Sequence, residues 1–187
     1  MQMVFCGIGG QGILLATRAI GEYALSKGFN VIGSEIHGMA QRGGSVVSHL
    51  KIGHYKSPLV MRGEADILLS FDWNEGLMNL PFLKEGGLAV LNGDINFKVN
   101  HPVIEELIKG RKIKLYIVDG YKVALWELGN PSVLNVVMLG ALSSLREDLF
   151  PSEGLRKVIE NIIPYKFRDI NLKAFDLGKR AEIKEVI

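Results

Sequence analysis

The sequence predicts an α/β fold, a three-layer α/β/α sandwich whose mostly parallel sheet is covered by helices on both faces. Short apolar runs alternate along the chain with stretches of helical periodicity, as in strands joined by crossover helices. The chain opens with a strand, a glycine-rich turn and a helix, and a later helix is apolar on nearly every side. Residues 45–60 resemble a hairpin, which would make the sheet mixed by adding an antiparallel edge.

Residues 1–6 form the first predicted strand, and a glycine cluster follows it. The cluster reads Gly7-Ile8-Gly9-Gly10-Gln11-Gly12. Apolar residues then recur at helical spacing, and the predicted stripe comprises Ile13, Leu14, Thr17, Ile20, Ala24 and Leu25. Gly28 suits the position just after the end of this helix.

Gly7, Gly9 and Gly12 satisfy the G-x-G-x-x-G pattern between a strand and a helix, where backbone N–H groups can receive an anion. The next predicted strand covers residues 29–33, and Glu35 follows where a dinucleotide site needs an acid for a ribose hydroxyl. One interpretation is therefore a free-standing Rossmann-like nucleotide-binding oxidoreductase domain. The other is a turn that packs the helix against the strand or lies at an interface.

A second cluster, residues 34–45, is the most polar segment between two predicted strands. It combines an acceptor, a titratable ring, an amide and a planar cation with glycines that permit positive φ. Such a loop, held by rigid strands, is a typical position for function. Its candidate ligand-binding or interface residues are Glu35, His37, Gly38, Gln41, Arg42, Gly43 and Gly44. Both clusters follow strands, so we expect them to meet on one rim of the sheet.

The rest of the chain continues the alternation. We expect Asp72 to cap a helix that Pro81 disturbs and Gly86-Gly87 ends, and Asn130-Pro131 to begin the apolar helix, which we place in the core. The further predicted strands are residues 45–52, 67–71, 88–91 and 113–118, and the further predicted helices are residues 102–109, 151–163 and 171–179.

Composition favours one globular domain spanning residues 1–187. Hydrophobic residues make up 48% of the chain, which excludes a disordered protein. The 22 basic and 20 acidic residues give a net charge of +2 and are interspersed, so the sequence indicates neither nucleic-acid nor membrane binding. No signal peptide or membrane span is recognisable, and we expect a cytoplasmic protein.

Cys6 is the only cysteine, so the chain contains no internal disulfide and cannot by itself hold an iron–sulfur cluster. We interpret Cys6 as a small core residue. Glu35, His37, His49 and His54 are possible metal ligands, but no pair has the helical spacing of a zinc site. We interpret these histidines as interface or surface residues and expect no metal.

Three blocks together carry a family resemblance. They are the glycine cluster 7–12, the polar segment with its following strand, residues 34–50, and a later block, residues 128–142. The chain resembles the gamma-type domain of 2-oxoacid:ferredoxin oxidoreductases over essentially its whole length. The Glu-x-His-Gly-Met-Ala-Gln-Arg-Gly-Gly version, residues 35–44, is most similar to the beta subunit of indolepyruvate ferredoxin oxidoreductase.

The resemblance implies an accessory subunit that is not catalytic alone. In the resembling enzymes a 2-oxo acid is decarboxylated on thiamine diphosphate, electrons pass through iron–sulfur clusters to ferredoxin, and the acyl group passes to coenzyme A. Here Gly93-Asp94 and Asp119-Gly120 are only fragments of a thiamine motif. Thiamine diphosphate, Mg²⁺ and the clusters are thus expected on a large partner subunit, with coenzyme A as co-substrate. In isolation we expect a homodimer or weak oligomer.

Overall fold

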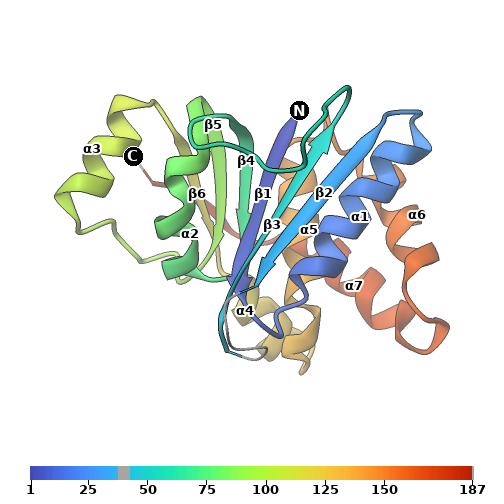
Figure 1. The fold of residues 1–187 in the computed structure, drawn as a ribbon. Coiled ribbons are helices and arrows are strands. Elements are labelled where there is room, and N and C mark those ends of the chain that lie inside the picture. Colours follow the sequence, from blue (N-terminus) through green and yellow to red (C-terminus); the bar gives the residue numbers. More distant parts are fainter. Residues whose placement is uncertain (38–42, 187) are drawn as a thin grey trace.

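The computed structural model describes residues 1–36 and 43–186, together with the backbone of residue 37. These residues form a seven-stranded sheet in the order β2-β3-β1-β4-β5-β6-β7 (Figure 1). The pairs β1–β4, β4–β5 and β5–β6 are parallel, whereas β1–β3, β2–β3 and β6–β7 are antiparallel. β3 and β7 therefore run against the other strands, and the sheet is mixed.

The elements have the following bounds. The strands are β1 Gln2–Ile8, β2 Val31–His37, β3 Ser45–Ile52, β4 Ala65–Ser70, β5 Leu83–Asn92, β6 Lys114–Val118 and β7 Ile183–Glu185. The α-helices are α1 Ile13–Ser26, α2 Trp73–Asn79, α3 Pro102–Gly110, α4 Gly120–Lys122, α5 Leu134–Leu145, α6 Ser152–Ile162 and α7 Arg168–Gly178. A π-helical turn, Val123–Glu127, follows α4, and 3₁₀ turns cover Leu80–Phe82, Pro131–Val133 and Tyr165–Phe167.

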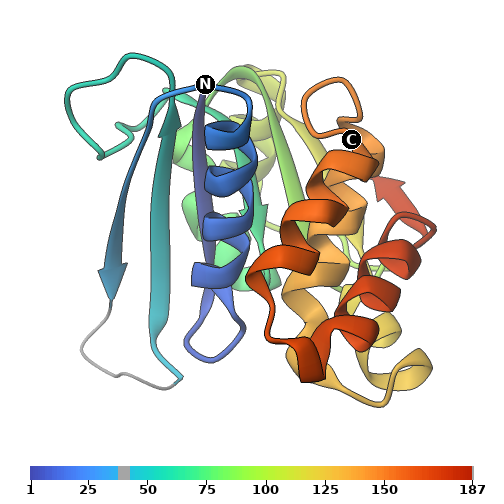
Figure 2. The ribbon, with the colours of Figure 1, turned by 90° about the vertical axis from the view of Figure 1, so that its right-hand side faces the viewer.

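Helices cover both faces of the sheet, as the sequence predicts. α1, α5, α6 and α7 pack on one face (Figure 2). Phe5 of β1 and Phe175 of α7 belong to the same buried cluster there. α2 and α3 cover the other face over β4, β5 and β6, around Leu68 and Ile108. Because parallel strands are hydrophobic on both sides, this sandwich buries the short apolar runs completely.

The hairpin differs from its prediction. β2 runs from residue 31 to residue 37, not from 29 to 33, so Glu35 and His37 belong to a strand and not to a loop. β3 pairs with β2 before it, from Val31 opposite Ile52 to His37 opposite Val46. β3 also pairs with β1, so it lies inside the sheet, and β2 is the edge strand. The residues after β3 add no strand.

The predictions around α2 are correct at its start and wrong at its end. The Asp72 carboxylate accepts a hydrogen bond from the Glu75 N–H at 3.0 Å and caps the helix. Gly86-Gly87 does not end this helix but lies within β5. The 3₁₀ turn after α2 leads directly into the strand, and the Gly86 N–H donates to the Arg111 carbonyl at 2.8 Å. β7, which was not predicted from the sequence, is only three residues long.

α5 is the core helix that the sequence predicts, with every residue from Leu134 to Ser143 buried. It crosses α7 closely, because Gly140 and Gly178 allow the two backbones to approach. A Cβ on Gly140 would lie 2.2 Å from the Phe175 carbonyl oxygen. On α1, in contrast, Leu14 and Leu25 are 44% and 52% exposed, so the buried stripe of that helix is narrower than predicted.

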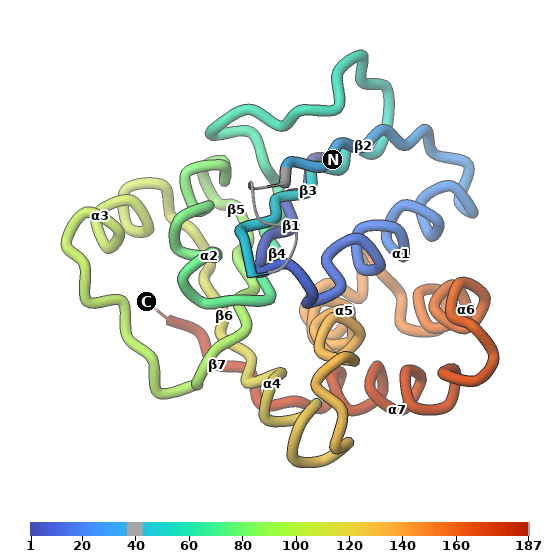
Figure 3. Tube along the Cα trace, turned by 60° about the horizontal axis from the view of Figure 1, so that its bottom comes forward, coloured from blue at the N-terminus to red at the C-terminus, as the bar shows by residue number. Residues whose placement is uncertain are grey.

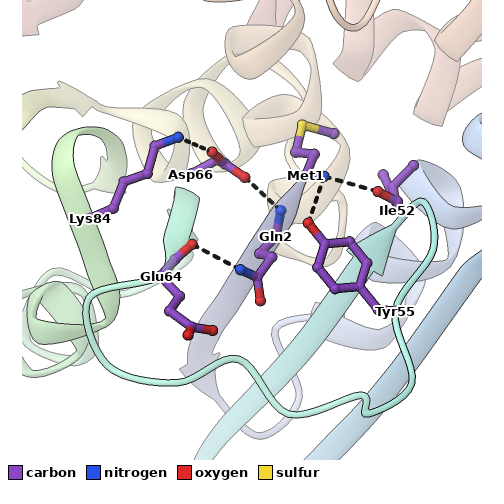
Figure 4. Close-up of polar contacts among 7 residues, drawn as sticks. All are labelled: Met1, Gln2, Ile52, Tyr55, Glu64, Asp66 and Lys84. Carbon is purple, nitrogen blue, oxygen red and sulfur yellow. Dashed lines mark hydrogen bonds and ion pairs between the residues drawn. The ribbon is translucent and has the colours of Figure 1, made fainter.

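A polar network secures the amino end of β1, the opposite end of this strand from the glycine turn. Figure 4 shows the residues that form it. The Gln2 N–H donates to the Asp66 carboxylate at 2.7 Å, and the Gln2 amide donates to the Glu64 carbonyl at 3.3 Å. Lys84 forms an ion pair with Asp66. Burial acts to raise the pKa of Asp66, but the hydrogen bonds from Lys84 and Gln2 outweigh it and lower the pKa.

Candidate functional site

The two predicted glycine clusters meet on one rim of the sheet. The Gly9 N–H donates to the Gly44 carbonyl at 2.8 Å, and the Gly43 N–H donates to the Gly9 carbonyl at 3.4 Å. This contact joins the turn after β1 to the residues just before β3, at the carboxyl ends of β1 and β2 (Figure 3). The expected meeting of these loops is confirmed.

The glycine turn is closed by side chains of this protein. The Gln11 side-chain oxygen accepts a hydrogen bond from the Ile8 N–H at 2.7 Å. Asn135 of α5 donates to the Gly12 carbonyl at 3.1 Å. A Cβ on Gly12 would lie 2.3 Å from the Asn135 amide nitrogen, and Gly12 has φ 75°. Packing and backbone conformation therefore account for this glycine whether or not an anion binds.

The predicted site residues do not all lie in this contact. The rim unites Gly9 and the turn residues Gly10, Gln11 and Gly12 with Gly43 and Gly44, whereas Gly7 lies within β1. Glu35 is exposed on β2, and His37 ends that strand. Gly38, Gln41 and Arg42 lie outside the described residues. Ser45, which starts β3, donates to the Glu75 carboxylate at 2.6 Å and so ties the rim to α2.

His49 corrects the interpretation of the histidines as interface or surface residues, because it is only 1% exposed. Its Nδ1 accepts a hydrogen bond from the Val60 N–H at 3.2 Å, and its ring lies edge-on to Phe82. Burial, followed by the nearby charge of Lys51, lowers the pKa of His49. His54 is exposed and shares a 3.1 Å hydrogen bond with Asn30.

A cleft of about 650 Å³, which was not predicted from the sequence, opens on the same rim. Gln11 of the glycine turn contributes to its wall, and the other contributors lie at or just after the carboxyl ends of β4, β5 and β6. The remaining lining residues are Asp72, Trp73, Asn92, Gly93, Asp94, Phe97, Asp119, Tyr121, Lys122 and Trp126. The chain segments that follow β5 and β6 pass to opposite faces of the sheet (Figure 3). In open α/β sheets, a crevice for ligands lies at such a point.

Asn92 holds the floor of this cleft together. Its amide nitrogen donates to the Phe71 carbonyl at 3.0 Å, and its side-chain oxygen accepts from the Tyr121 N–H at 3.1 Å. The loops after β4 and β6 are thus fixed through one side chain at the end of β5. A sequence signal for the cleft existed, since Asp72, Asp94 and Asp119 each occur within two residues of a strand's carboxyl end.

The described residues do not fit an iron–sulfur cluster. Cys6 is fully buried, its thiol contacts the Ser70 hydroxyl at 3.2 Å, and burial raises its pKa to about 12. A cluster needs several thiolates, whereas this thiol stays protonated at neutral pH. Within residues 1–36 and 43–186, no three His, Cys, Asp or Glu side chains gather as metal ligands.

A second cavity, of about 710 Å³, lies at the other end of the strands, beside the network of Figure 4. Lys84, Lys114 and Arg146 contribute cations to its wall. Two of these are already paired, Lys84 with Asp66 and Arg146 with Asp148 at 2.7 Å. The rim with the glycine contact and the aromatic cleft is therefore the better candidate site.

Comparison with known proteins places the chain among subunits of oxidoreductases. It is 36% identical to the indolepyruvate oxidoreductase subunit IorB of Pyrococcus horikoshii, over 96% of this chain and 94% of that protein. It is also 36% identical to the corresponding subunit of Methanothermobacter thermautotrophicus, over 92% of this chain and 93% of that protein.

A solved structure has the same fold over nearly the whole length. The gamma subunit of a keto/oxoacid ferredoxin oxidoreductase from Geobacter sulfurreducens superposes with a TM-score of 0.75 at 27% identity, covering 96% of each chain. In the described parts of this chain, no helix has the length and apolar character needed to cross a membrane. The family model for pyruvate ferredoxin/flavodoxin oxidoreductase matches residues 2–181, and the chain belongs to that family.

Proposed function

We propose that residues 1–187 act as one unit, the accessory beta/gamma-type subunit of a cytoplasmic 2-oxoacid:ferredoxin oxidoreductase. The substrate is indolepyruvate or a related arylpyruvate, which the complex decarboxylates oxidatively to an acyl-CoA while ferredoxin is reduced. Similarity to IorB proteins over nearly their full length supports the substrate class. We assign the rim where Gly9 contacts Gly44 as the region that contacts the partner subunit.

The observation that carries the accessory role is the chemistry of the single thiol. Cys6 is buried and protonated, so this chain has no thiolate for electron transfer through a cluster. The rim offers polar groups and backbone conformations suited to contact, but among the described residues it assembles no group of metal ligands. The thiamine diphosphate, Mg²⁺ and iron–sulfur clusters accordingly belong to a large partner subunit, and coenzyme A is a co-substrate of the complex.

The test is purification of the native complex through an affinity tag at the C-terminus of this chain. A large subunit containing iron and thiamine diphosphate should co-elute in fixed stoichiometry. The complex should reduce ferredoxin when supplied with indolepyruvate and coenzyme A, and neither subunit should do so alone. Reconstitution from separately purified subunits provides the control for contaminating oxidoreductases.

Isothermal titration of the isolated chain with NAD(H) tests the rival function, a free-standing nucleotide-binding domain. Because Asn135 and Gln11 already close the glycine turn, we expect no heat of binding. Stoichiometric NAD(H) binding together with failure to bind any thiamine-containing subunit would overturn the accessory role.

A further inference from the structure

The cleft on the rim carries an unusual number of exposed aromatic rings. Trp126 is 81% exposed, Tyr121 48% and Phe97 42%. The Phe97 ring lies against Trp73, with 5.4 Å between the ring centroids. Large aromatic side chains at a protein surface are characteristic of interaction sites, where they contribute most of the binding energy.

Trp126 is held in position by its own turn. It lies on the π-helical turn Val123–Glu127, whose residues Val123 and Ala124 are buried in the core. The Gly129 N–H donates to the Leu125 carbonyl at 3.0 Å, and the Asn130 N–H donates to the Ala124 carbonyl at 2.9 Å. π-helical turns are rare and frequently occur at functional sites. The turn thus presents the indole from an anchored backbone, which lowers the entropic cost of binding.

Three carboxylates border the same cleft. Each caps its own loop with one oxygen: Asp72 accepts from the Glu75 N–H at 3.0 Å, Asp94 from the Asn96 N–H at 2.8 Å, and Asp119 from the Lys122 N–H at 3.0 Å. Among the described residues, none of the three forms an ion pair with a basic side chain. Three aspartates and one lysine leave the cleft wall with a formal charge of −2.

We propose that this cleft receives an arginine-bearing segment of the large partner subunit, an inference that rests on the proposed function. A guanidinium group is planar, stacks on aromatic rings and forms bidentate hydrogen bonds with carboxylates. The cleft offers both kinds of contact within one space, since Trp73, Trp126 and the three aspartates all line it. The segment joins the partner to the rim beside Gln11, in continuity with the contact between Gly9 and Gly44.

Charge-neutral variants test the ionic half of the proposal without removing the loop caps. Asparagine keeps the side-chain oxygen that accepts each backbone N–H. The triple variant Asp72→Asn, Asp94→Asn, Asp119→Asn should therefore fold normally but bind the purified large subunit roughly tenfold more weakly. Its affinity should also depend less on salt concentration. Asp169→Asn, an exposed aspartate on α7 that does not line the cleft, is the matched control and should bind like wild type.

Trp126→Ala tests the aromatic half. An 81% exposed side chain contributes little to the core, so the isolated chain should keep its thermal stability while the Kd for the large subunit rises roughly tenfold. Tyr165→Ala is the control, because Tyr165 is 85% exposed but does not line the cleft. A photo-crosslinker at position 126 should label a partner peptide that contains arginine.

The outcomes separate the two hypotheses. If the wild-type chain does not bind the large subunit, the proposed function fails and this inference fails with it. If wild type binds but the triple variant and Trp126→Ala bind equally well, only the cleft assignment is overturned. The cleft assignment is also overturned if the variants assemble normally but the complex is no longer saturated by coenzyme A. That result would identify the cleft as a small-molecule site. Labelling of a partner peptide without arginine also contradicts the proposal.

Discussion

His49 shows how one buried side chain makes the stability of this chain depend on pH. Because Nδ1 accepts the Val60 N–H, the neutral ring carries its proton on Nε2, which has no hydrogen-bond partner among the described residues. Protonation would place a second N–H and a charge inside the protein near Lys51. The folded state therefore favours the neutral ring, and the pKa of His49 lies below its usual value of 6.5.

The sign of the pH effect follows from this lowered pKa. Above pH 6.5 the ring is neutral in both the folded and the unfolded states, so protonation imposes no penalty. Below pH 6.5 the unfolded chain takes up the proton more readily, and the free energy of unfolding should fall. Urea denaturation at pH 7.5 and pH 5 should show this loss in wild type and a smaller loss in His49→Gln. His54→Gln, at an exposed position, should retain the wild-type loss; equal losses in all three proteins would contradict the assignment.

Arg42 carries a prediction that rests on the sequence alone, because it lies outside the described residues. A glycine-flanked arginine suits a charge-assisted contact with a carboxylate or phosphate of the partner, the substrate or coenzyme A. Arg42→Ala should leave the stability of the isolated chain within about 0.5 kcal/mol of wild type but weaken assembly or turnover by about 2–5 kcal/mol. Urea denaturation and ferredoxin reduction measure the two effects. Arg62→Ala, at an exposed position, is the control. If Arg42→Ala unfolds the isolated chain, Arg42 has a structural role and the prediction is wrong.

At the scale of elements, the contact between α5 and α7 determines how tightly the helical layer packs. Cβ atoms added to Gly140 and Gly178 would lie 2.2 Å and 2.0 Å from backbone carbonyl oxygens of the facing helix. Backbone atoms cannot move aside as a flexible side chain can. These two glycines are therefore required by close approach rather than by an unusual backbone conformation.

Gly140→Ala should consequently destabilise the chain by about 1–3 kcal/mol or more, because the helices must separate. Gly110→Ala is the matched control: Gly110 ends α3, and nothing lies within 4 Å of a Cβ placed there. It should be neutral or stabilising by up to about 1 kcal/mol through helix propensity. Thermal or urea unfolding measures the stability of both variants. If Gly140→Ala is as stable as Gly110→Ala, the helices adjust without cost and the prediction is wrong.

At the scale of the whole molecule, the chain is expected to lack cofactors and to carry an uncovered contact surface. The carefully purified chain should contain no iron and no tightly held zinc, since its one cysteine is buried and protonated. It should contain no thiamine diphosphate, since its sequence holds only fragments of a thiamine motif. Metal analysis and mass spectrometry of the released cofactors measure this. Stoichiometric iron in the isolated chain would contradict it.

The isolated chain should also self-associate, because exposed aromatic side chains at the rim favour contact with a second copy when the partner is absent. Sedimentation should show a homodimer or weak oligomer that dissociates when the large subunit is added. A strict monomer at high concentration that binds no thiamine-containing subunit would favour the nucleotide-binding alternative.

The fold class, the opening strand–turn–helix unit, the buried α5 helix and the meeting of the two glycine clusters could all be predicted from the sequence. These features depend on local periodicity and on the direction of strands, both of which follow from the pattern of neighbouring residues. In contrast, the strand position of Gly86-Gly87, the burial of His49 and the aromatic cleft between the loops after β4, β5 and β6 became apparent only in the folded chain. Those outcomes depend on residues far apart in the chain, as in the 123-residue separation between Gly12 and Asn135, and such pairings are set by the packing of the whole core.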